Sequence, residues 1–258
     1  MELSYRQKCD LYDRGFVKIE GVVPRAMVDA ALRAINHSMG EGMAPERMPI
    51  FRAQSYCPEI QREPVITDLL NRTPAWSLAE SAIGSGRIQP VTGAQVALRF
   101  PNLNDEPGRA SPHIDGMHSP TNGVPQGQIL NFTALAGILL SDVPGPNAGN
   151  FTVWPGSHHL LQAHFQEHGP ESLLAGLPQV SLGEPMQITG KAGDIVIAHY
   201  ELAHGVTPNV SPSIRYAIFF RLHHVDHDAH RWESMTDIWL QWEGMREVAA
   251  QRRDRAAV

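Results

Sequence analysis

The chain has 258 residues, of which 42% are hydrophobic and 19% are charged, so it can bury a full core and is not expected to be disordered. Its 21 Lys and Arg against 27 Asp and Glu give a net charge of −6, which disfavours nucleic-acid binding. No polybasic run and no bilayer-spanning apolar run is present, so no membrane partner is expected. Cys9 and Cys57 form no metal or disulfide framework, and the polar N-terminal residues resemble no signal peptide, which predicts a cytoplasmic protein.

The first 86 residues are expected to be mainly helical. Met27, Val28, Ala31 and Ile35 form one apolar stripe at helical spacing, whereas residues 16–19 alternate between apolar and polar as a strand does. The predicted helices span residues 4–14, 24–38, 59–71 and 74–83, and residues 40–58 are predicted to be a loop.

The pattern changes near residue 87, where short apolar segments alternate with turns rich in Gly and Pro. Residues 102–127 are predicted to be a long loop, and a loop of this length in a compact domain is usually functional. Many short strands favour an antiparallel sandwich or jelly roll, so we expect a mainly β fold with peripheral helices. The predicted strands span 88–100, 129–140, 151–154, 186–189, 194–199 and 216–223, with a helical segment at 158–176.

No internal repeat or low-complexity linker divides the chain, so one domain over residues 1–258 is expected, with an N-terminal part at 1–86 and a jelly-roll core at 87–224. A last helix is predicted over 231–253, where large apolar residues recur at intervals of three or four. Such a helix could dock on its own domain, form a homodimer contact or act as a lid. Its apolar residues are Trp232, Met235, Ile238, Trp239, Trp242, Met245 and Val248.

One short motif carries the chemistry of a metal site. In His113-Ile114-Asp115 the alternating geometry of a strand end can present an imidazole and a carboxylate to one ion. A facial iron site needs a second histidine from a distant strand, and His204 follows an apolar strand-like segment further along the chain. His199, five residues earlier, is the weaker candidate for that ligand. The second triplet, His224-Val225-Asp226, has no comparable strand after it and is interpreted as polar surface sequence.

Four segments in order resemble the phytanoyl-CoA dioxygenase family of Fe(II)/2-oxoglutarate oxygenases, over about residues 4–223. The family shows a Gly-Asp pair, an apolar strand, a ligand His followed by Gly, a Pro-Asn pair and then an Arg. A Pro-Gly-Ser-His turn after a central strand also fits. The matching residues here are Gly15 to Ile19, Val153 to His158, Gly193-Asp194, His204-Gly205, Pro208-Asn209 and Arg215.

The resemblance implies a double-stranded β-helix, which is a cupin-like jelly roll, with His113, Asp115 and His204 as iron ligands. It implies that Arg215 binds the distal carboxylate of 2-oxoglutarate, a role that suits a planar guanidinium. Fe(II), 2-oxoglutarate and O2 are therefore the expected cofactor and cosubstrates, and hydroxylation of a small organic substrate would release succinate and CO2. Related halogenases lack the carboxylate that Asp115 provides here, so oxidation is favoured over halogenation.

Several polar residues on predicted strands are further candidates. Gln95 and Arg99 share one strand face, and by analogy with the family Arg99 would help to hold 2-oxoglutarate and Gln95 would contact substrate. Asn131 and Thr133 interrupt an apolar strand and need partners if they are buried, either the cosubstrate or an ordinary buried network. His118 follows the metal motif by three residues and is either a substrate contact or a solvated loop residue.

Two other functions remain open on the residues alone. A non-catalytic, cupin-like metal-binding module would need the two histidines and the aspartate but not Arg215. An iron oxygenase could also carry out desaturation, cyclisation or epimerisation, because these reactions share the ferryl step with hydroxylation.

Overall fold

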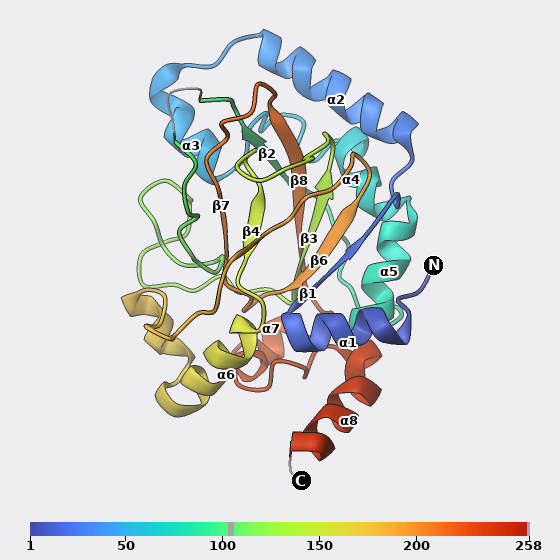
Figure 1. The fold of residues 1–258 in the computed structure, drawn as a ribbon, viewed down its shortest axis with the longest axis vertical. Coiled ribbons are helices and arrows are strands. Elements are labelled where there is room, and N and C mark those ends of the chain that lie inside the picture. Colours follow the sequence, from blue (N-terminus) through green and yellow to red (C-terminus); the bar gives the residue numbers. More distant parts are fainter. Residues whose placement is uncertain (103–105, 257–258) are drawn as a thin grey trace.

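The computed structural model describes residues 1–102 and 106–256, in which two antiparallel sheets face each other and helices cover the outside (Figure 1). The larger sheet has the strand order β1-β6-β3-β8-β2 and the smaller sheet has the order β5-β4-β7. The larger sheet contains β1 (Phe16–Ile19), β2 (Gln95–Arg99), β3 (Ala134–Leu139), β6 (Ile195–His199) and β8 (Arg215–Leu222). The smaller contains β4 (Phe151–Val153), β5 (Met186–Gln187) and β7 (His204–Val206).

Helices contribute more residues than strands do. Helical residues make up 36% of the chain and strand residues 18%, so the expectation of a mainly β fold is not confirmed. The α-helices are α1 (Tyr5–Arg14), α2 (Arg25–Gly40), α3 (Met48–Ala53), α4 (Pro64–Asn71), α5 (Pro74–Ile83), α6 (Ser157–His168), α7 (His227–His230) and α8 (Arg246–Ala256). Short 3-10 helices are η1 (Pro45–Arg47), η2 (Pro170–Ala175), η3 (Glu233–Met235) and η4 (Glu243–Met245). No described helix is long and apolar enough to cross a membrane.

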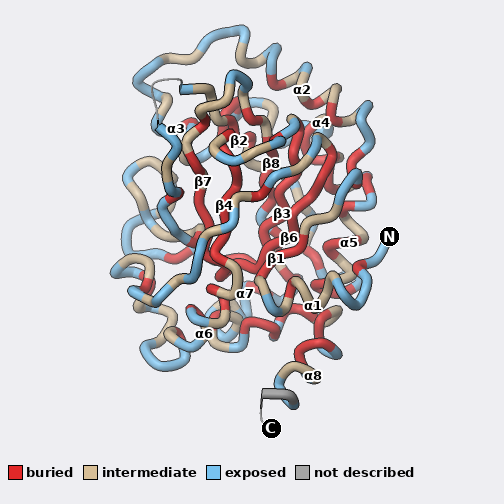
Figure 2. The backbone as a smooth tube through the Cα atoms, viewed as in Figure 1, coloured by how far each residue is buried: buried red, intermediate tan, exposed pale blue. Residues whose placement is uncertain are grey.

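The larger sheet is buried on both faces, which explains the continuous apolar run of its central strand (Figure 2). Ala136 and Ile138 of β3 point into a core shared with α1, α2, α4 and α5. Leu135 and Leu139 point the other way, into the core between the two sheets. On that side a Cβ at Gly137 would lie 2.7 Å from the Phe219 ring, so the glycine lets β3 and the ring approach closely.

Most local predictions agree with the observed elements within a few residues, but several do not. The strands predicted to begin at residues 88 and 129 begin only at Gln95 and Ala134. Residues 40–58 contain η1 and α3 instead of a continuous loop. The short strand β7, which begins at His204, was not predicted as a strand because three residues carry no measurable alternation. The loop predicted over 102–127 contains no helix or regular strand in its described residues, and residues 103–105 lie outside the described part.

The continuous helix expected over 231–253 is wrong. The segment follows α7, forms the short 3-10 helices η3 and η4, and becomes a regular α-helix only at Arg246. Trp242 has φ −127° and ψ 63°, which is not helical, and its side chain is only 1% exposed. Trp239 is also buried, 5.0 Å from the Tyr12 ring of α1 between ring centroids. The apolar residues that suggested a homodimer face are therefore largely buried within this chain, as docking on the same domain requires.

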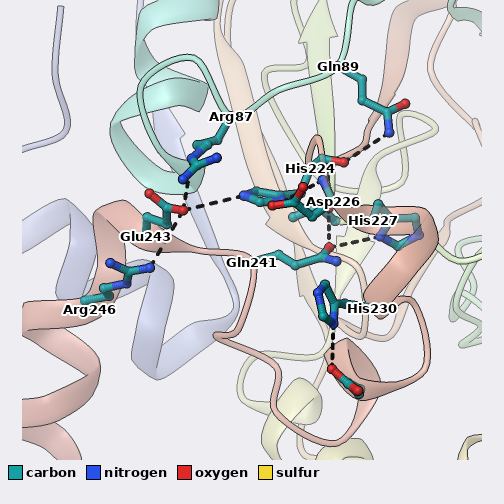
Figure 3. A network of polar contacts seen from close by, with 11 residues as sticks. Arg87, Gln89, His224, Asp226, His227, His230, Gln241, Glu243 and Arg246 are labelled. Atoms are coloured by element: carbon teal, nitrogen blue, oxygen red, sulfur yellow. Dashed lines mark hydrogen bonds and ion pairs between the residues drawn. The ribbon is translucent and has the colours of Figure 1, made fainter.

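The second triplet is exposed at Val225 and Asp226, as its interpretation as surface sequence expected, but its histidine is buried. His224 is 4% exposed and lies between Asp226 and Glu243, whose carboxylate oxygens are each 3.8 Å from a ring nitrogen (Figure 3). Glu243 also contacts Arg87 at 3.1 Å and Arg246 at 3.7 Å. These ion pairs fasten the C-terminal segment to the end of β8 and to the loop before β2, which gives the triplet a structural role.

His199 makes the fold sensitive to acid. Burial lowers the pKa of His199 to about 4, although the Ile238 carbonyl that accepts its Nε2–H bond acts in the opposite direction. The unfolded chain binds this proton near pH 6.5, so protons favour unfolding between pH 6.5 and 4. We expect His199 to remove about 2 kcal/mol of unfolding free energy between pH 7 and pH 5.

Urea unfolding at both pH values, for the wild type and for His199→Gln, isolates this contribution from those of other titrating groups. The variant should lose less stability on acidification than the wild type. Equal losses would contradict the assignment.

Candidate metal centre and cavity

Two histidines from distant parts of the chain meet across a single antiparallel bridge. His113, in the loop between β2 and β3, exchanges two backbone hydrogen bonds with His204 at the start of β7, at N–O distances of 2.9 and 2.8 Å. Their rings lie 4.6 Å apart between centroids. Asp115, two residues further on, presents its side chain on the same side, as the alternation of an extended segment requires. The backbone pairing thus brings the three side chains together.

The three side chains form a candidate metal site. Asp115 Oδ1 lies 3.7 Å from His113 Nε2 and 3.5 Å from His204 Nε2, and the ligand atoms all lie within 4.8 Å of one another. His204 Nδ1 contacts the Leu202 carbonyl at 2.9 Å, so it carries the proton and leaves the Nε2 lone pair free for a metal. Two imidazoles and one carboxylate are the donor set of facial non-haem Fe(II) sites, so these residues fit such an ion.

Gly116 explains how the loop turns sharply beside the metal ligands. Its φ of +82° is left-handed, and a Cβ there would lie 2.3 Å from the Leu130 carbonyl oxygen. The Leu130 amide donates to the Gly116 carbonyl at 2.9 Å. A side chain at this position would push the loop away from Leu130, and Asp115 with it.

Arg221 on β8 contacts the carboxylate of Asp115. Its Nη2 lies 2.7 Å from Asp115 Oδ2 and donates to Gln95 Oε1 at 3.1 Å. Burial alone would raise the pKa of Asp115, but Arg221 and His204 outweigh it and hold the pKa well below its usual range. The pocket walls and the neighbouring His204 lower the pKa of His113 to about 4, so its imidazole is neutral near pH 7. Both ligands are therefore in their metal-binding forms.

Sequence reasoning missed Arg221, although a signal was present. Alternate residues of a strand share one face, so Arg215, Ala217, Phe219 and Arg221 all point to the same side of β8. Because Arg215 was expected to face the cavity, the same alternation predicts that Arg221, six residues later on the strand, faces it too.

Arg221→Gln is expected to weaken metal binding by about tenfold, because partners that orient a ligand typically contribute 10–100-fold to affinity. With Oδ2 released, the Asp115 carboxylate can rotate away from the two histidines. Calorimetric titration of the metal-free chain with Co(II) measures the effect, and Arg221→Lys, which keeps the charge, should recover part of it. Unchanged affinity in Arg221→Gln would show that Arg221 does not orient the ligand.

The candidate metal site lies in the wall of a cavity between the two sheets. This cavity has a volume of about 790 Å³, and we call it the main cavity. Two arginines, the buried Arg215 and the half-buried Arg99, lie in another part of its wall. Arg99 of β2 and Arg215 of β8 are direct cross-strand partners, and like charges in that position repel each other. Burial, followed by this repulsion, lowers the pKa of Arg215 to about 9. Burial and Arg52 lower the pKa of Arg99 to about 10.

The Arg99–Arg215 pair has no carboxylate partner among the described residues. Arg215 is 2% exposed, and it donates from Nε to the Gly149 carbonyl at 2.8 Å and from Nη1 to the Ala97 carbonyl at 3.1 Å. Its Nη2 and the Nε of Arg99 are buried without a hydrogen-bond partner. A buried cation with free donors is costly until an anion binds it, so the cavity fits a carboxylate at this end.

The other candidate residues divide into two groups. Gln95 and His118 line the main cavity together with the triad and the arginine pair. Asn131 and Thr133 do not line it and are engaged elsewhere: Asn131 Nδ2 donates to the Arg231 carbonyl at 2.6 Å, and Thr133 Oγ1 donates to Gln241 Oε1 at 2.8 Å. The ordinary buried network, which was the alternative for these two residues, describes their contacts.

His199 lies apart from the triad. It is buried against Trp242, with 5.3 Å between ring centroids, and its two ring nitrogens bind the Ile238 carbonyl and the Glu201 amide. No ring nitrogen is left for a metal, which leaves His204 as the second histidine of the site.

The fold and the site define a metal-binding protein with two facing antiparallel sheets and a cationic pair in the same cavity. The sequence matches the family model described as phytanoyl-CoA dioxygenase (PhyH) over residues 11–217. This protein belongs to the phytanoyl-CoA dioxygenase family. No curated protein sequence matches the chain.

Several solved structures share the fold. EctD from S. alaskensis, crystallised with 2-oxoglutarate and 5-hydroxyectoine, has a TM-score of 0.56 and 18% identity, over 87% of this chain and 77% of that chain. HygX from Streptomyces hygroscopicus, with nickel and 2-oxoglutarate bound, has a TM-score of 0.51 and 15% identity, over 87% and 88%. SnoK, a non-heme alpha ketoglutarate dependent carbocyclase from nogalamycin biosynthesis, has a TM-score of 0.50 and 18% identity, over 89% and 90%.

Proposed function

We propose that this protein is a non-haem Fe(II)- and 2-oxoglutarate-dependent dioxygenase that hydroxylates a small organic substrate and releases succinate and CO2. The observation that carries the proposal is the pair of half-buried Arg99 and buried Arg215 in the same cavity as His113, Asp115 and His204. A structural metal would require the triad but not a pair of arginines that has free donors and no carboxylate partner among the described residues. Family membership and the 2-oxoglutarate complexes of EctD and HygX support the same function.

The two sheets are proposed to be the two sides of a double-stranded β-helix, the jelly roll of cupin-like proteins. Support comes from their antiparallel strand order and from the apolar core between them. In such a fold the strands supply a rigid wall while loops supply the variable contacts. Here β7, β2 and β8 carry His204, Arg99 and Arg215, and the loop before β3 carries the other two metal ligands.

Each residue of the site has a separate task in this proposal. His113, His204 and Asp115 Oδ1 hold the metal, and bound Fe(II) supplies the redox chemistry with O2 and 2-oxoglutarate. Arg221 keeps Asp115 Oδ2 occupied, so the carboxylate offers one oxygen and leaves more of the metal open. Arg215, beside Arg99, binds the distal carboxylate of 2-oxoglutarate and fixes its orientation. The apolar walls around them, including Leu135, exclude water from the reacting groups.

Hydroxylation is the reaction proposed among those that this fold supports. Asp115 is itself the third protein ligand of the candidate site, and its presence argues against halide binding at that position. The EctD structure contains a hydroxylated compound, 5-hydroxyectoine. SnoK is a carbocyclase, and SnoN, an epimerase crystallised with Fe3+ and alpha ketoglutarate, has a TM-score of 0.50, so the fold also serves other outcomes. Substrate placement, which differs between such enzymes, decides among these reactions.

The first experiment adds Fe(II) and then 2-oxoglutarate to the metal-free protein in the absence of O2. We expect a visible charge-transfer band that saturates at one 2-oxoglutarate per chain, since the keto acid must bind the iron directly. Succinate release in air then identifies substrates. If iron binds but the band does not form, the alternative function, a non-catalytic cupin-like metal-binding module, replaces the proposed one.

A further inference from the structure

A second hollow of about 430 Å³ adjoins the main cavity, and we call it the annex. Gln54, Gln95, Phe219 and Arg221 line both hollows, so the two lie side by side. Arg221 lies at the junction, with its guanidinium 2.7 Å from the metal ligand Asp115. A molecule that reached from the metal past Arg221 would enter the annex.

The annex is strongly biased toward positive charge. Arg62 and Arg221 line it, and no carboxylate does so among the described residues. In the annex and main cavity together, five arginines face a single acid, Asp115. This composition is the reverse of that of the whole chain, which has a net charge of −6. A cleft lined by charge of one sign attracts ligands of the opposite sign.

Free hydrogen-bond donors are concentrated at one place in the annex. The amide groups of Gln54 and Gln89 already donate to the Thr121 and His224 carbonyls at 2.9 and 3.1 Å. The side chain of Arg62 makes no hydrogen bond or ion pair with any described residue. Its neighbour Gln61 is held by its backbone, whose carbonyl accepts from the Ala94 amide at 3.0 Å. Arg62 is an exposed residue in the lining of the annex, so its guanidinium is open to solvent and free for a ligand.

The annex and the Arg99–Arg215 pair lie at opposite ends of the same strand pair. Gln95 begins β2 at the annex and Arg99 ends it at the arginine pair. Four residues of extended strand span about 13 Å. One small dicarboxylate that occupies the arginine pair cannot also reach Arg62, so the two ends can bind two different anions.

We propose that the annex binds an anionic group of the substrate, a carboxylate or a phosphate, with Arg62 as its main charged contact. The proposal rests on the proposed function, because it assigns the main cavity to 2-oxoglutarate and the reacting part of the substrate. It makes Arg62 a specificity-determining residue. The substrate is then an anionic organic molecule. Its oxidised carbon lies near the metal site, and its charged group lies on the other side of Arg221, in the annex.

The test uses the full chain loaded with Zn(II) and saturated with 2-oxoglutarate, so that the arginine pair is already occupied. Inorganic phosphate is the probe, and broadening of its 31P resonance reports binding. We expect Arg62→Gln to weaken phosphate binding at least fivefold and Arg62→Glu to abolish it. Arg33→Gln is the matched control, because Arg33 is an exposed residue of α2 that lines neither hollow, and it should bind phosphate as the wild type does.

Acetate distinguishes the two anion classes: competition with phosphate indicates that carboxylates are also accepted, and lack of competition restricts the site to phosphate. Absence of phosphate binding to the wild type, or equal affinity in Arg62→Gln, would overturn the proposal. If 2-oxoglutarate fails to bind while the Arg62 variants still lose phosphate, the proposed function fails and the anion site stands. If 2-oxoglutarate binds and the Arg62 variants behave as wild type, only the anion site fails.

Discussion

Replacing Arg215 by glutamine is expected to weaken 2-oxoglutarate binding about 100-fold while metal affinity stays within about twofold of the wild type. The guanidinium is buried and would form a charge-assisted pair with the distal carboxylate, and loss of one partner from such a pair typically costs about 2–5 kcal/mol. Arg215 contacts none of the three metal ligands through a hydrogen bond. Titration of the Fe(II) protein with 2-oxoglutarate without O2 measures the first quantity, and calorimetry with Co(II) measures the second.

Arg215→Lys separates charge from geometry in the same measurement. Lysine keeps the positive charge but cannot form two parallel hydrogen bonds, so it should restore only part of the affinity. A glutamine variant that binds 2-oxoglutarate as tightly as the wild type would remove Arg215 from its proposed role. Equal loss of metal binding and 2-oxoglutarate binding would instead indicate damage to the cavity as a whole.

Asp115→Ala should reduce substrate oxidation by at least about 1,000-fold and metal affinity by about 100-fold or more. Asp115 is the only carboxylate of the triad, and its removal leaves two neutral imidazoles for a divalent cation. The variant also leaves Arg221 without its anionic partner, which adds uncompensated positive charge beside the metal. Succinate release coupled to substrate oxidation gives the rate, and calorimetry with Co(II) gives the affinity.

The chain supplies its own control for this experiment. Asp226 belongs to a second triplet of the same pattern, but it contacts the buried His224 and lines neither the main cavity nor the annex. Asp226→Ala should keep metal affinity and rate near those of the wild type. If Asp226→Ala loses metal and Asp115→Ala does not, the site has been assigned to the wrong triplet.

The sequence carried enough information to nominate the triad, because its residue types are unusual in combination. An imidazole and a carboxylate two positions apart, with a distant histidine after an apolar strand, restrict the chemistry strongly. Arg215 was nominated by its position in the family pattern. The structure brings all four residues to one cavity, and it adds the detail that Arg99 faces Arg215 across the strand pair.

Other predictions failed for physical reasons that can be named. Spacings of three residues between Trp239, Trp242 and Met245 suggested one helix, yet the same spacings arise here where 3-10 helices and irregular turns bury these three side chains. Gly244 is part of the reason, since a Cβ there would lie 2.1 Å from the Ser81 carbonyl oxygen, and the chain must approach α5 closely at this point. Asn131 was assigned to a strand face by alternation, but β3 begins only at Ala134.

The pairing of β1 with β6 also has a consequence for how the protein is made. Phe16 pairs with Ala198, so the strand that leaves the ribosome first must wait for about 180 further residues before its partner exists. His113 likewise cannot form its backbone bridge until His204, its partner, has been synthesised. Long-range pairings of this kind slow folding, because the chain must close large loops before any contact compensates for the lost entropy. Metal capture is therefore expected to be a late event in biosynthesis, after nearly the whole sheet has been translated.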